Sequence, residues 1–581
     1  MITNQEIARV LAEIGEYLDM QGVAFKPRAY QKAAETIAAL EQEVSEIYRR
    51  GGVKALQEIP GVGKSIAEHI GELLKTGHLK YYDELKRKTP VDLSTLTQVE
   101  GLGPKKIRKL YQELGIRNLA DLEKAAKTHK IAKLENFGPK SEENILKGIE
   151  FVKKSGGRHI LGFAMPDIRI IEERLRQLKE VERLDIVGSF RRRKETIGDI
   201  DILIISKKSE PVMDFFVNMP EVARVYAHGE TKSMVHLKNG LDADLRVVPP
   251  ISYGAALNYF TGSKDHNIAL RELAIKKGWK LNEYGLFRGG RNKRKEERIA
   301  GRTEEEIYKK LGMDYIEPEL REMTGEIEAA RAHKLPELIP YGSLKGDLQT
   351  QTNWSDGANT IEEMAEAARK FGLEYIVITD HSKRLAMTHG LDGRRLVQQM
   401  KAIDKINQGL KIKDQRFKIL KGTECDILKD GSMDLPDEVL KQLDVVGASI
   451  HSHFNLPIKE QTERVKKAMR NPYVDIIFHP TARVIQKREP VALDMEEIVR
   501  VAKETGTILE IDSYPDRLDL KDEYIRKCVE AGVKMSIDSD AHSIQHFGVL
   551  EFGIAQARRG WAKRGDIINS WPVGKMLNFL K

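Results

Sequence analysis

Cysteine is scarce in this chain, since the 581 residues include only Cys425 and Cys528. Two thiols so far apart exclude a disulfide framework and a zinc site built from thiolates. Long apolar runs are also missing, and the N-terminus has neither the basic start nor the apolar core of a secretion signal. We therefore expect a protein of the reducing cytoplasm with no membrane role.

Charge, by contrast, is abundant. Hydrophobic residues make up 41% and charged residues 32%, a balance typical of folded domains, and the length predicts several of them. The formal net charge is +8, and basic runs lie beside glycines at 105–109, 191–194 and 291–295. Such clusters favour a polyanionic partner; for the third run alone, a solvated charged face is the preferred interpretation.

The hydrophobic period changes along the chain. From residue 4 to about 154, apolar residues recur at helical spacing between short glycine turns, which predicts an all-α region. Strand-like runs at 184–187, 200–205 and 245–248 then predict a mixed α/β unit. After a proline-punctuated segment, short apolar runs alternate with helices, which predicts a parallel sheet closed into a barrel. These runs lie at 375–378, 417–420, 445–448, 475–478, 508–511 and 535–537.

Glycine turns precede two of the expected helices. Free backbone N–H groups at such a helix start bind phosphate without contacting bases. One such turn is weak evidence, because glycine also permits close helix packing, but two copies with basic followers favour DNA binding. The two turns resemble helix-hairpin-helix motifs, and a third at 137–140 is expected to be structural. The residues concerned are Gly61, Gly63 and Lys64 in the first, and Gly101, Gly103 and Lys105 in the second.

Three aspartates in the mixed unit form a candidate catalytic site. Asp199 and Asp201 are two residues apart on one strand, so they face the same side, and Asp244 could join them from a neighbouring strand. Such a trio can hold two divalent cations for phosphoryl transfer, with Mg²⁺ or Mn²⁺ as the expected ion. Surface aspartates on an edge strand are the alternative, but the pair lies among isoleucines, where unpaired charge is costly.

Four ordered motifs resemble the family X DNA polymerases of the DNA polymerase beta type: GSFRR at 188–192, GDIDIL at 198–203, DADLR at 242–246 and YFTGS at 259–263. The resemblance spans roughly the first 315 residues. It implies that the three aspartates bind metal and that gapped or primer-template DNA and deoxynucleoside triphosphates are the partners of a monomer. The implied nucleotide-binding residues are Gly188, Ser189, Arg192, Gly198, Tyr259, Phe260, Gly262 and Asn267. The implied DNA-binding residues are Lys26, Arg246 and Arg271, together with those of the two hairpins.

One position departs from the beta-type pattern. Those enzymes use a lysine in the helix after the first hairpin as the Schiff-base nucleophile that removes a 5′-deoxyribose phosphate, and His69 stands there. An imidazole cannot form that imine. We therefore expect weak or absent lyase activity, with Lys64 or another nearby lysine as the substitute.

Candidate metal ligands follow the strands expected in the C-terminal part. Because the carboxyl ends of barrel strands share one rim, they predict a metal cluster suited to Zn²⁺, Mn²⁺ or Fe and to phosphate ester hydrolysis. The set is Asp356, His381, Glu424, His451, His479, Asp540 and His542. It resembles the polymerase and histidinol phosphatase (PHP) domain. That family begins DLHxHxxxSDG, whereas this chain has Gln349 and Gln351 at the two histidine positions, so we expect loose or incomplete metal binding.

The expected architecture is multidomain: an all-α helix-hairpin-helix region, an α+β nucleotidyltransferase palm and a distorted β/α barrel. The boundaries are a DNA-end-binding domain at 1–90, a second DNA-binding subdomain at 91–154, a palm at 155–250, a nucleotide-selecting subdomain at 251–316, a linker at 317–340 and a PHP domain at 341–581.

The leading functional hypothesis is a repair polymerase that fills short gaps and carries a 3′-5′ exonuclease or phosphoesterase domain. A nucleotidyltransferase on RNA or small molecules is the second hypothesis, and the two DNA-binding hairpins argue against it. A non-catalytic DNA-end scaffold is the third, and the three aspartates argue against it. For the PHP half alone, a structural or DNA-docking domain without hydrolysis is the alternative.

Overall fold

The computed structural model describes residues 2, 4–23, 25–38, 40, 42–97, 99, 102–155, 157–289, 296–384, 388–413 and 417–580. The chain divides into two compact units. The first comprises residues 1–158 and 484–489, and the second comprises residues 159–483 and 490–581. Among the described residues, no helix is both long and apolar enough to span a bilayer.

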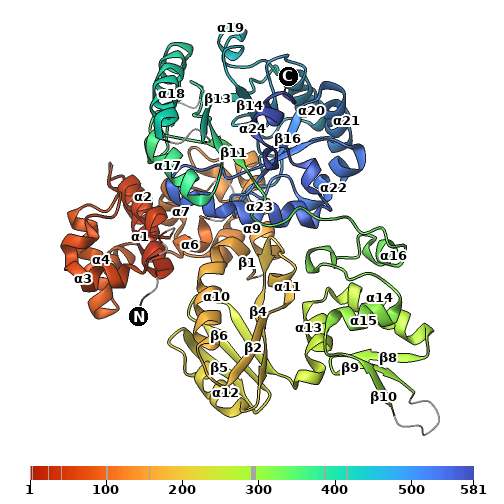
Figure 1. Cartoon of the computed structure of the whole chain (residues 1–581). Coiled ribbons are helices and arrows are strands. Elements are labelled where there is room, and N and C mark those ends of the chain that lie inside the picture. The colour runs from red at the N-terminus through yellow and green to blue at the C-terminus, as the bar shows by residue number, and fades with distance from the viewer. Residues whose placement is uncertain are drawn as a thin grey trace. The chain divides into compact units, whose positions relative to one another are not determined.

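Helices make up the first unit, which confirms the predicted all-α region (Figure 1). Apolar side chains at helical spacing, such as Ile7, Leu11 and Ile14, are fully buried in its core. The helices are α1 (Asn4–Met20), α2 (Lys26–Ala38), α3 (Val44–Leu56), α4 (Lys64–Thr76), α5 (Lys80–Lys88), α6 (Leu93–Leu96), α7 (Pro104–Leu114), α8 (Leu119–Lys127) and α9 (Pro139–Ser155).

The palm of the second unit is a five-stranded sheet with the order β2-β4-β7-β6-β5. Its strands are β2 (Val181–Ile186), β4 (Asp199–Ser206), β5 (Val222–His228), β6 (Lys232–Leu237) and β7 (Asp242–Val247). β4 and β7 are parallel, whereas the other pairs in the sheet are antiparallel. The alternation of buried and partly exposed residues along β4 explains why the strand presents its aspartates on one face.

A smaller subdomain follows the palm. It combines α13 (Tyr253–Thr261), α14 (Lys264–Lys276) and α15 (Glu304–Leu311) with a sheet of β8 (Trp279–Asn282), β9 (Gly285–Arg288) and β10 (Glu297–Ala300). The segment at 317–340, which we expected to be a linker, contains η3 (Pro318–Leu320) and α16 (Glu326–Arg331). Leu320, Ile327 and Ala330 of this segment are buried in the core of the subdomain.

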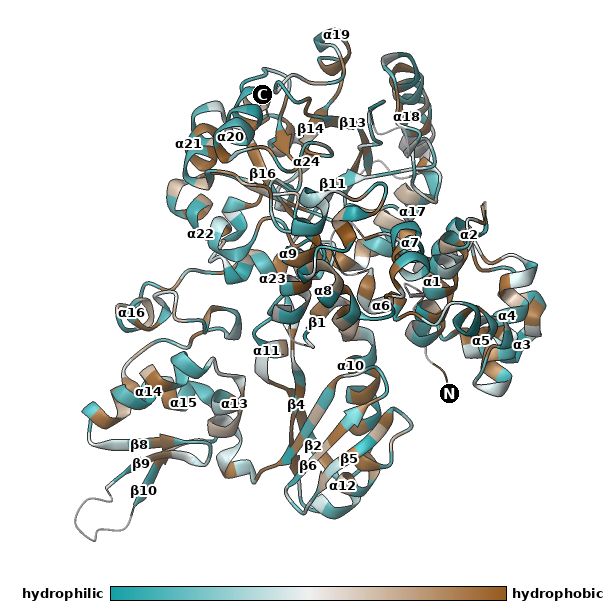
Figure 2. Cartoon of the chain, turned by 180° about the vertical axis from the view of Figure 1, so that it is seen from behind, coloured by the Kyte–Doolittle hydropathy of each residue, from teal (hydrophilic) through white to brown (hydrophobic). Residues whose placement is uncertain are grey.

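Seven parallel strands form the C-terminal sheet, in sequence order from β11 to β17. A parallel bridge from Thr350 to Ala541 links its first and last strands, so the sheet is a nearly closed barrel, as predicted. In Figure 2, apolar strands such as β14 and β16 stand beside helices with polar faces, such as α22 (Asp522–Ala531). The strands are β11 (Gly346–Thr350), β12 (Tyr375–Ile378), β13 (Lys418–Asp426), β14 (Val445–Ser449), β15 (Ile476–Ile477), β16 (Ile508–Asp512) and β17 (Met535–Asp538).

Candidate active sites in the palm and the barrel

The palm aspartates lie on the two parallel strands at the centre of the sheet. Asp199 and Asp201 are on β4, and Asp201 stands opposite Asp244 of β7. Burial, followed by the negative charges of Asp199 and Asp244, raises the pKa of Asp201 to about 7. A carboxyl group in such a field gains most from a bound cation, so the donor set fits divalent metal.

One of these carboxylates already has a cationic neighbour. Lys232 Nζ of β6 lies 3.2 Å from Asp244 Oδ2. Among the described residues, the groups of three histidine and acidic residues whose ligand atoms all lie within 4.8 Å of one another are in the barrel. The three palm aspartates do not form such a group. The three palm aspartates thus lie on the same face of the sheet, and Asp244 forms an ion pair with Lys232.

The GSFRR segment lies directly beside the aspartates. Gly188 has φ 64°, and a Cβ there would lie only 2.5 Å from Asp201 Oδ2, so glycine is required for this close approach. Arg192 Nε donates to Glu322 Oε1 at 2.9 Å, and Arg192 Nη1 donates to the carbonyl oxygen of Thr261. The structure thus joins Arg192 to the helix that precedes Gly262.

The YFTGS segment forms the end of α13. The rings of Tyr259 and Phe260 meet edge to face with centroids 5.1 Å apart, and the Arg246 guanidinium lies 4.7 Å from the Phe260 centroid. Asn267 Nδ2 donates to the Tyr259 carbonyl at 2.7 Å, and Arg271 Nε donates to the Asn267 carbonyl at 3.2 Å. The predicted nucleotide-contacting residues are therefore neighbours.

Periodicity and motif spacing did not reveal a buried ion pair behind this site. Arg191 is bonded through both terminal nitrogens to Glu304, and Arg321 Nη1 donates to the same carboxylate at 2.6 Å. Arg321 is fully buried, and Glu304 is 3% exposed. The pairing joins residues far apart in sequence, so no local pattern could have found it.

In the first unit, both hairpin turns lead into helices. α4 starts at Lys64 after Gly63, α7 starts at Pro104 after Gly103, and Gly61 has φ 81°. Lys26 begins α2, and Lys105 Nζ lies 3.9 Å from Asp19. The predicted position Gly101 lies outside the described residues.

His69 of α4 is packed between aromatic rings. Its Nδ1 is 2.7 Å from the Tyr30 hydroxyl, and its ring stacks on Tyr81 with centroids 4.8 Å apart. Burial lowers the pKa of His69. The imidazole is therefore neutral near pH 7 and has a structural contact in place of a free amine.

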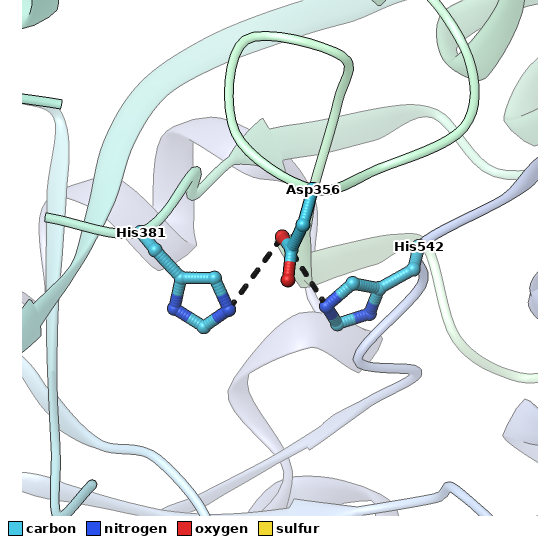
Figure 3. A group of neighbouring side chains, drawn as sticks. All are labelled: Asp356, His381 and His542. Carbon is cyan, nitrogen blue, oxygen red and sulfur yellow. Dashed lines mark ion pairs between the residues drawn. The ribbon is translucent and has the colours of Figure 1, made fainter. Parts of the chain in front are cut away.

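The barrel brings its candidate ligands together at one rim. Figure 3 shows Asp356 between His381 and His542, with its Oδ1 3.7 Å from the Nε2 atom of each imidazole. Asp356 follows β11, His381 follows β12 and His542 follows β17. Three mixed nitrogen and oxygen donors at this spacing fit a transition metal ion.

A second group surrounds Glu424 of β13. Its carboxylate lies 3.3 Å from His381 Nδ1, 3.1 Å from His451 Nε2 and 2.8 Å from His479 Nε2. Burial alone would raise the pKa of Glu424, but the imidazoles of His381 and His451 outweigh it and hold that pKa well below the usual range. Burial would lower the pKa of His451, but Glu424 and Asp426 raise it to about 9. A metal bound here has to displace this proton.

Gln349 lies on β11 and Gln351 directly after its last residue, and both side chains are fully buried. Gln351 Nε2 donates to Glu424 Oε2 at 3.0 Å, which leaves its own Oε1 without a hydrogen bond. Neither amide atom of Gln349 has a partner. Asp540, another predicted ligand, lies 3.8 Å from the Nε atom of Arg517. This part of the rim therefore has amides at the two positions where the family pattern has histidines, and a guanidinium beside Asp540.

Family models match five stretches of the chain. They are described as a helix-hairpin-helix domain (residues 2–79), a SAM-like helix-hairpin-helix tandem (93–150), a DNA polymerase beta palm (167–236), a DNA polymerase beta thumb (256–322) and a PHP domain (347–513). The chain is 37% identical to the DNA polymerase/3′-5′ exonuclease PolX of Bacillus subtilis (strain 168) over 580 residues, which are 99% of each protein. The chain belongs to the family X DNA polymerases.

Two further relatives match only part of this family X polymerase. A "probable phosphatase" of Thermoanaerobacter sp. (strain X514) is 32% identical over 246 residues, which are 40% of this chain and 94% of that protein. DNA polymerase lambda of Rattus norvegicus is 26% identical over 349 residues, which are 55% of this chain and 56% of that protein.

The raised pKa of Asp201 predicts how this polymerase depends on pH. Below about pH 7 its carboxyl group holds a proton that a metal ion has to displace, and above it the carboxylate is free to bind. We expect the Mg²⁺ concentration for half-maximal nucleotide incorporation to fall about tenfold from pH 6 to pH 8. Incorporation rates titrated with Mg²⁺ at each pH check this. Equal half-saturation at both pH values would contradict it.

The packing of His69 predicts weak deoxyribose phosphate lyase activity. Borohydride trapping on an incised abasic substrate measures the covalent adduct, and we expect little of it because the imidazole forms no imine. The matched variant His69→Lys restores an amine at the same position and should increase the trapped adduct. A strong adduct with the unaltered protein would show that another lysine is correctly placed.

Proposed function

We propose that this protein is a DNA-directed DNA polymerase that fills short gaps during repair by two-metal nucleotidyl transfer. The observation that carries the proposal is the arrangement of Asp199, Asp201 and Asp244 on two adjacent parallel strands, with Gly188 closely packed against Asp201. Similarity over 99% of the chain to a protein named DNA polymerase/3′-5′ exonuclease supports it.

In this proposal each group has a defined task. Asp199, Asp201 and Asp244 hold the cations, and bound Mg²⁺ or Mn²⁺ supplies the positive charge that activates the primer 3′-hydroxyl and neutralises the triphosphate. Gly188, Ser189 and Arg192 donate to the triphosphate, for which the arginine fork is well suited.

The remaining predicted residues act on the sugar and on the DNA. Tyr259, Phe260 and Gly262 contact the nucleotide sugar, while Asn267 and Arg271 contact the minor groove. Arg246, Lys26 and the hairpin residues bind the DNA backbone, which accounts for affinity without base recognition. We further propose that the protein acts as a monomer in the cytoplasm.

For the PHP domain we propose weak 3′-5′ exonuclease or phosphoesterase activity. Asp356, His381 and His542 would hold one metal ion, and Glu424 with His381 and His451 a second, beside His479, with Zn²⁺, Mn²⁺ or Fe as the suited ions. A bound metal supplies an activated water at neutral pH. Asp540, Gln349 and Gln351 offer a poorer donor set, so a third ion would be weakly held.

A domain that docks DNA without hydrolysis is the second candidate for this half. Gln351 occupies one oxygen of Glu424 with a hydrogen bond, and Arg517 lies near Asp540. An amide and a guanidinium thus supply the polar contacts of part of the site. The double glutamine variant described below tests between these two candidates.

Asp201→Ala is expected to abolish nucleotide incorporation while DNA affinity stays nearly unchanged. The change removes a metal ligand, whereas affinity comes from many phosphate contacts. Primer extension and DNA binding are measured on the same gapped substrate. Asp242→Ala is the matched control, because Asp242 is exposed on the neighbouring strand and bonded to His236, and its activity should stay near that of the unaltered protein. Loss of binding without loss of incorporation would contradict the proposal.

The double variant Gln349→His and Gln351→His is expected to raise both bound metal and 3′-end hydrolysis. Imidazole is the stronger donor for borderline transition metals, and hydrolysis needs the ions together. Metal content by elemental analysis and nuclease rate in Mn²⁺ are the two readouts. If both stayed unchanged, the glutamines would be neutral replacements and the weakened-site hypothesis would fail.

A further inference from the structure

The nucleotide-contacting segment of the palm is bonded to a helix of the barrel domain. That helix is α23 (Leu550–Arg559), and its last side chain is 3% exposed. Arg559 Nη1 donates to the main-chain carbonyl of Arg192 at 2.9 Å. Its Nη2 donates to Asp522 Oδ2 at 2.5 Å, which anchors the guanidinium inside the barrel domain.

A shared carboxylate extends this contact to the side chain of Arg192. Glu322 Oε1 accepts from Arg192 Nε at 2.9 Å and from Arg559 Nη1 at 3.3 Å. The Arg192 Nη1 atom is bonded to the Thr261 carbonyl. Arg192 is therefore fixed at its main chain and at two guanidinium nitrogens.

The end of the same segment has a second attachment. Glu195 forms a two-bond ion pair with Arg483, with distances of 2.5 and 3.2 Å, and accepts from Gln556 Nε2 of α23 at 2.8 Å. Gly162 also lies close against the barrel domain, since a Cβ there would lie only 2.6 Å from Pro515 Cβ. The segment at 192–195 thus lies against the barrel domain.

These contacts matter because an arginine side chain has many rotamers. Ordering such a side chain costs conformational entropy, and a binding group that is already ordered avoids this cost when the ligand arrives. Arg559 is itself buried between two carboxylates, Asp522 and Glu322, so its charge is paired and its position is fixed.

We propose that Arg559 of the PHP domain is a positioning residue for nucleotide addition: it orients Arg192 for the triphosphate, so the barrel domain is part of the polymerase nucleotide site. The inference rests on the proposed polymerase function. It predicts that the PHP domain supports nucleotide binding whether or not its own metal site hydrolyses DNA.

The test compares two adjacent arginines of α23 in the full-length protein. Arg559→Gln is expected to raise KM for the incoming dNTP about tenfold, with kcat changed less than twofold. The reason is that the variant weakens dNTP binding by the same amount in the ground state and in the transition state. KM for gapped DNA should not change. Arg559→Lys keeps the charge but loses the fork, and should raise KM for dNTP by a smaller factor, about threefold.

The matched control is Arg558→Gln. Arg558 is also buried at the end of α23, but it donates to Glu319 Oε1 at 2.7 Å and to the Ile339 carbonyl at 3.0 Å. Its loss should lower the melting temperature without changing KM for dNTP. If both variants raised KM for dNTP equally, Arg559 would have only a structural role and the proposal would be overturned.

A double-variant cycle isolates the link to Arg192. In an Arg192→Ala background, which raises KM by itself, Arg559→Gln should add little, because there is no guanidinium left to orient. An undiminished tenfold increase in that background would overturn the proposal, as would an unchanged KM in both Arg559→Gln and Arg559→Lys. If Arg559→Gln failed to fold, Arg559→Lys alone would decide. Failure of the polymerase function itself would appear separately, as absent incorporation by the unaltered protein.

Discussion

Crowding of negative charge at strand ends is the constraint on which both proposed active sites depend. In the palm, three aspartates share one face, and the pKa of Asp201 rises to about 7 because it is buried and its neighbours are also acidic. In the barrel, Glu424 is fully buried and its charge is balanced by imidazoles. Carboxylates in such surroundings need cations, and Lys232, Arg517 and the protonated His451 lie beside carboxylates of the two sites in this structure.

Local patterns in the sequence predicted much of the fold. Glycine turns marked the starts of α4 and α7, and apolar runs marked six of the seven barrel strands. β11 was not predicted because its residues, Gly-Asp-Leu-Gln-Thr, are mostly polar, although all five are buried in the structure. A strand that closes a barrel faces protein on both sides, so its side chains are buried whatever their polarity, and hydropathy alone cannot reveal it.

Such patterns could not predict ion pairs between residues that are far apart in the sequence. The aspartates, the GSFRR segment and the barrel histidines were each visible from local spacing. The partners that hold them were not: Lys232 beside Asp244, Glu304 with Arg321, and Glu322 with Arg559. The segment at 317–340 illustrates the same limit, because its prolines suggested a linker whereas Leu320 and Ile327 lie in a core.

The barrel has candidate metal ligands at its rim and buried arginine ion pairs with the palm, and substitutions at these two places have different consequences. The barrel closes with amides at Gln349 and Gln351 on its rim, because its core is apolar and does not include these residues. A buried guanidinium between two domains is less tolerant, since removing one partner leaves an unpaired charge that costs several kcal/mol. The contacts of Arg559 and Arg483 with the palm therefore join the barrel domain to the polymerase part without involving the rim.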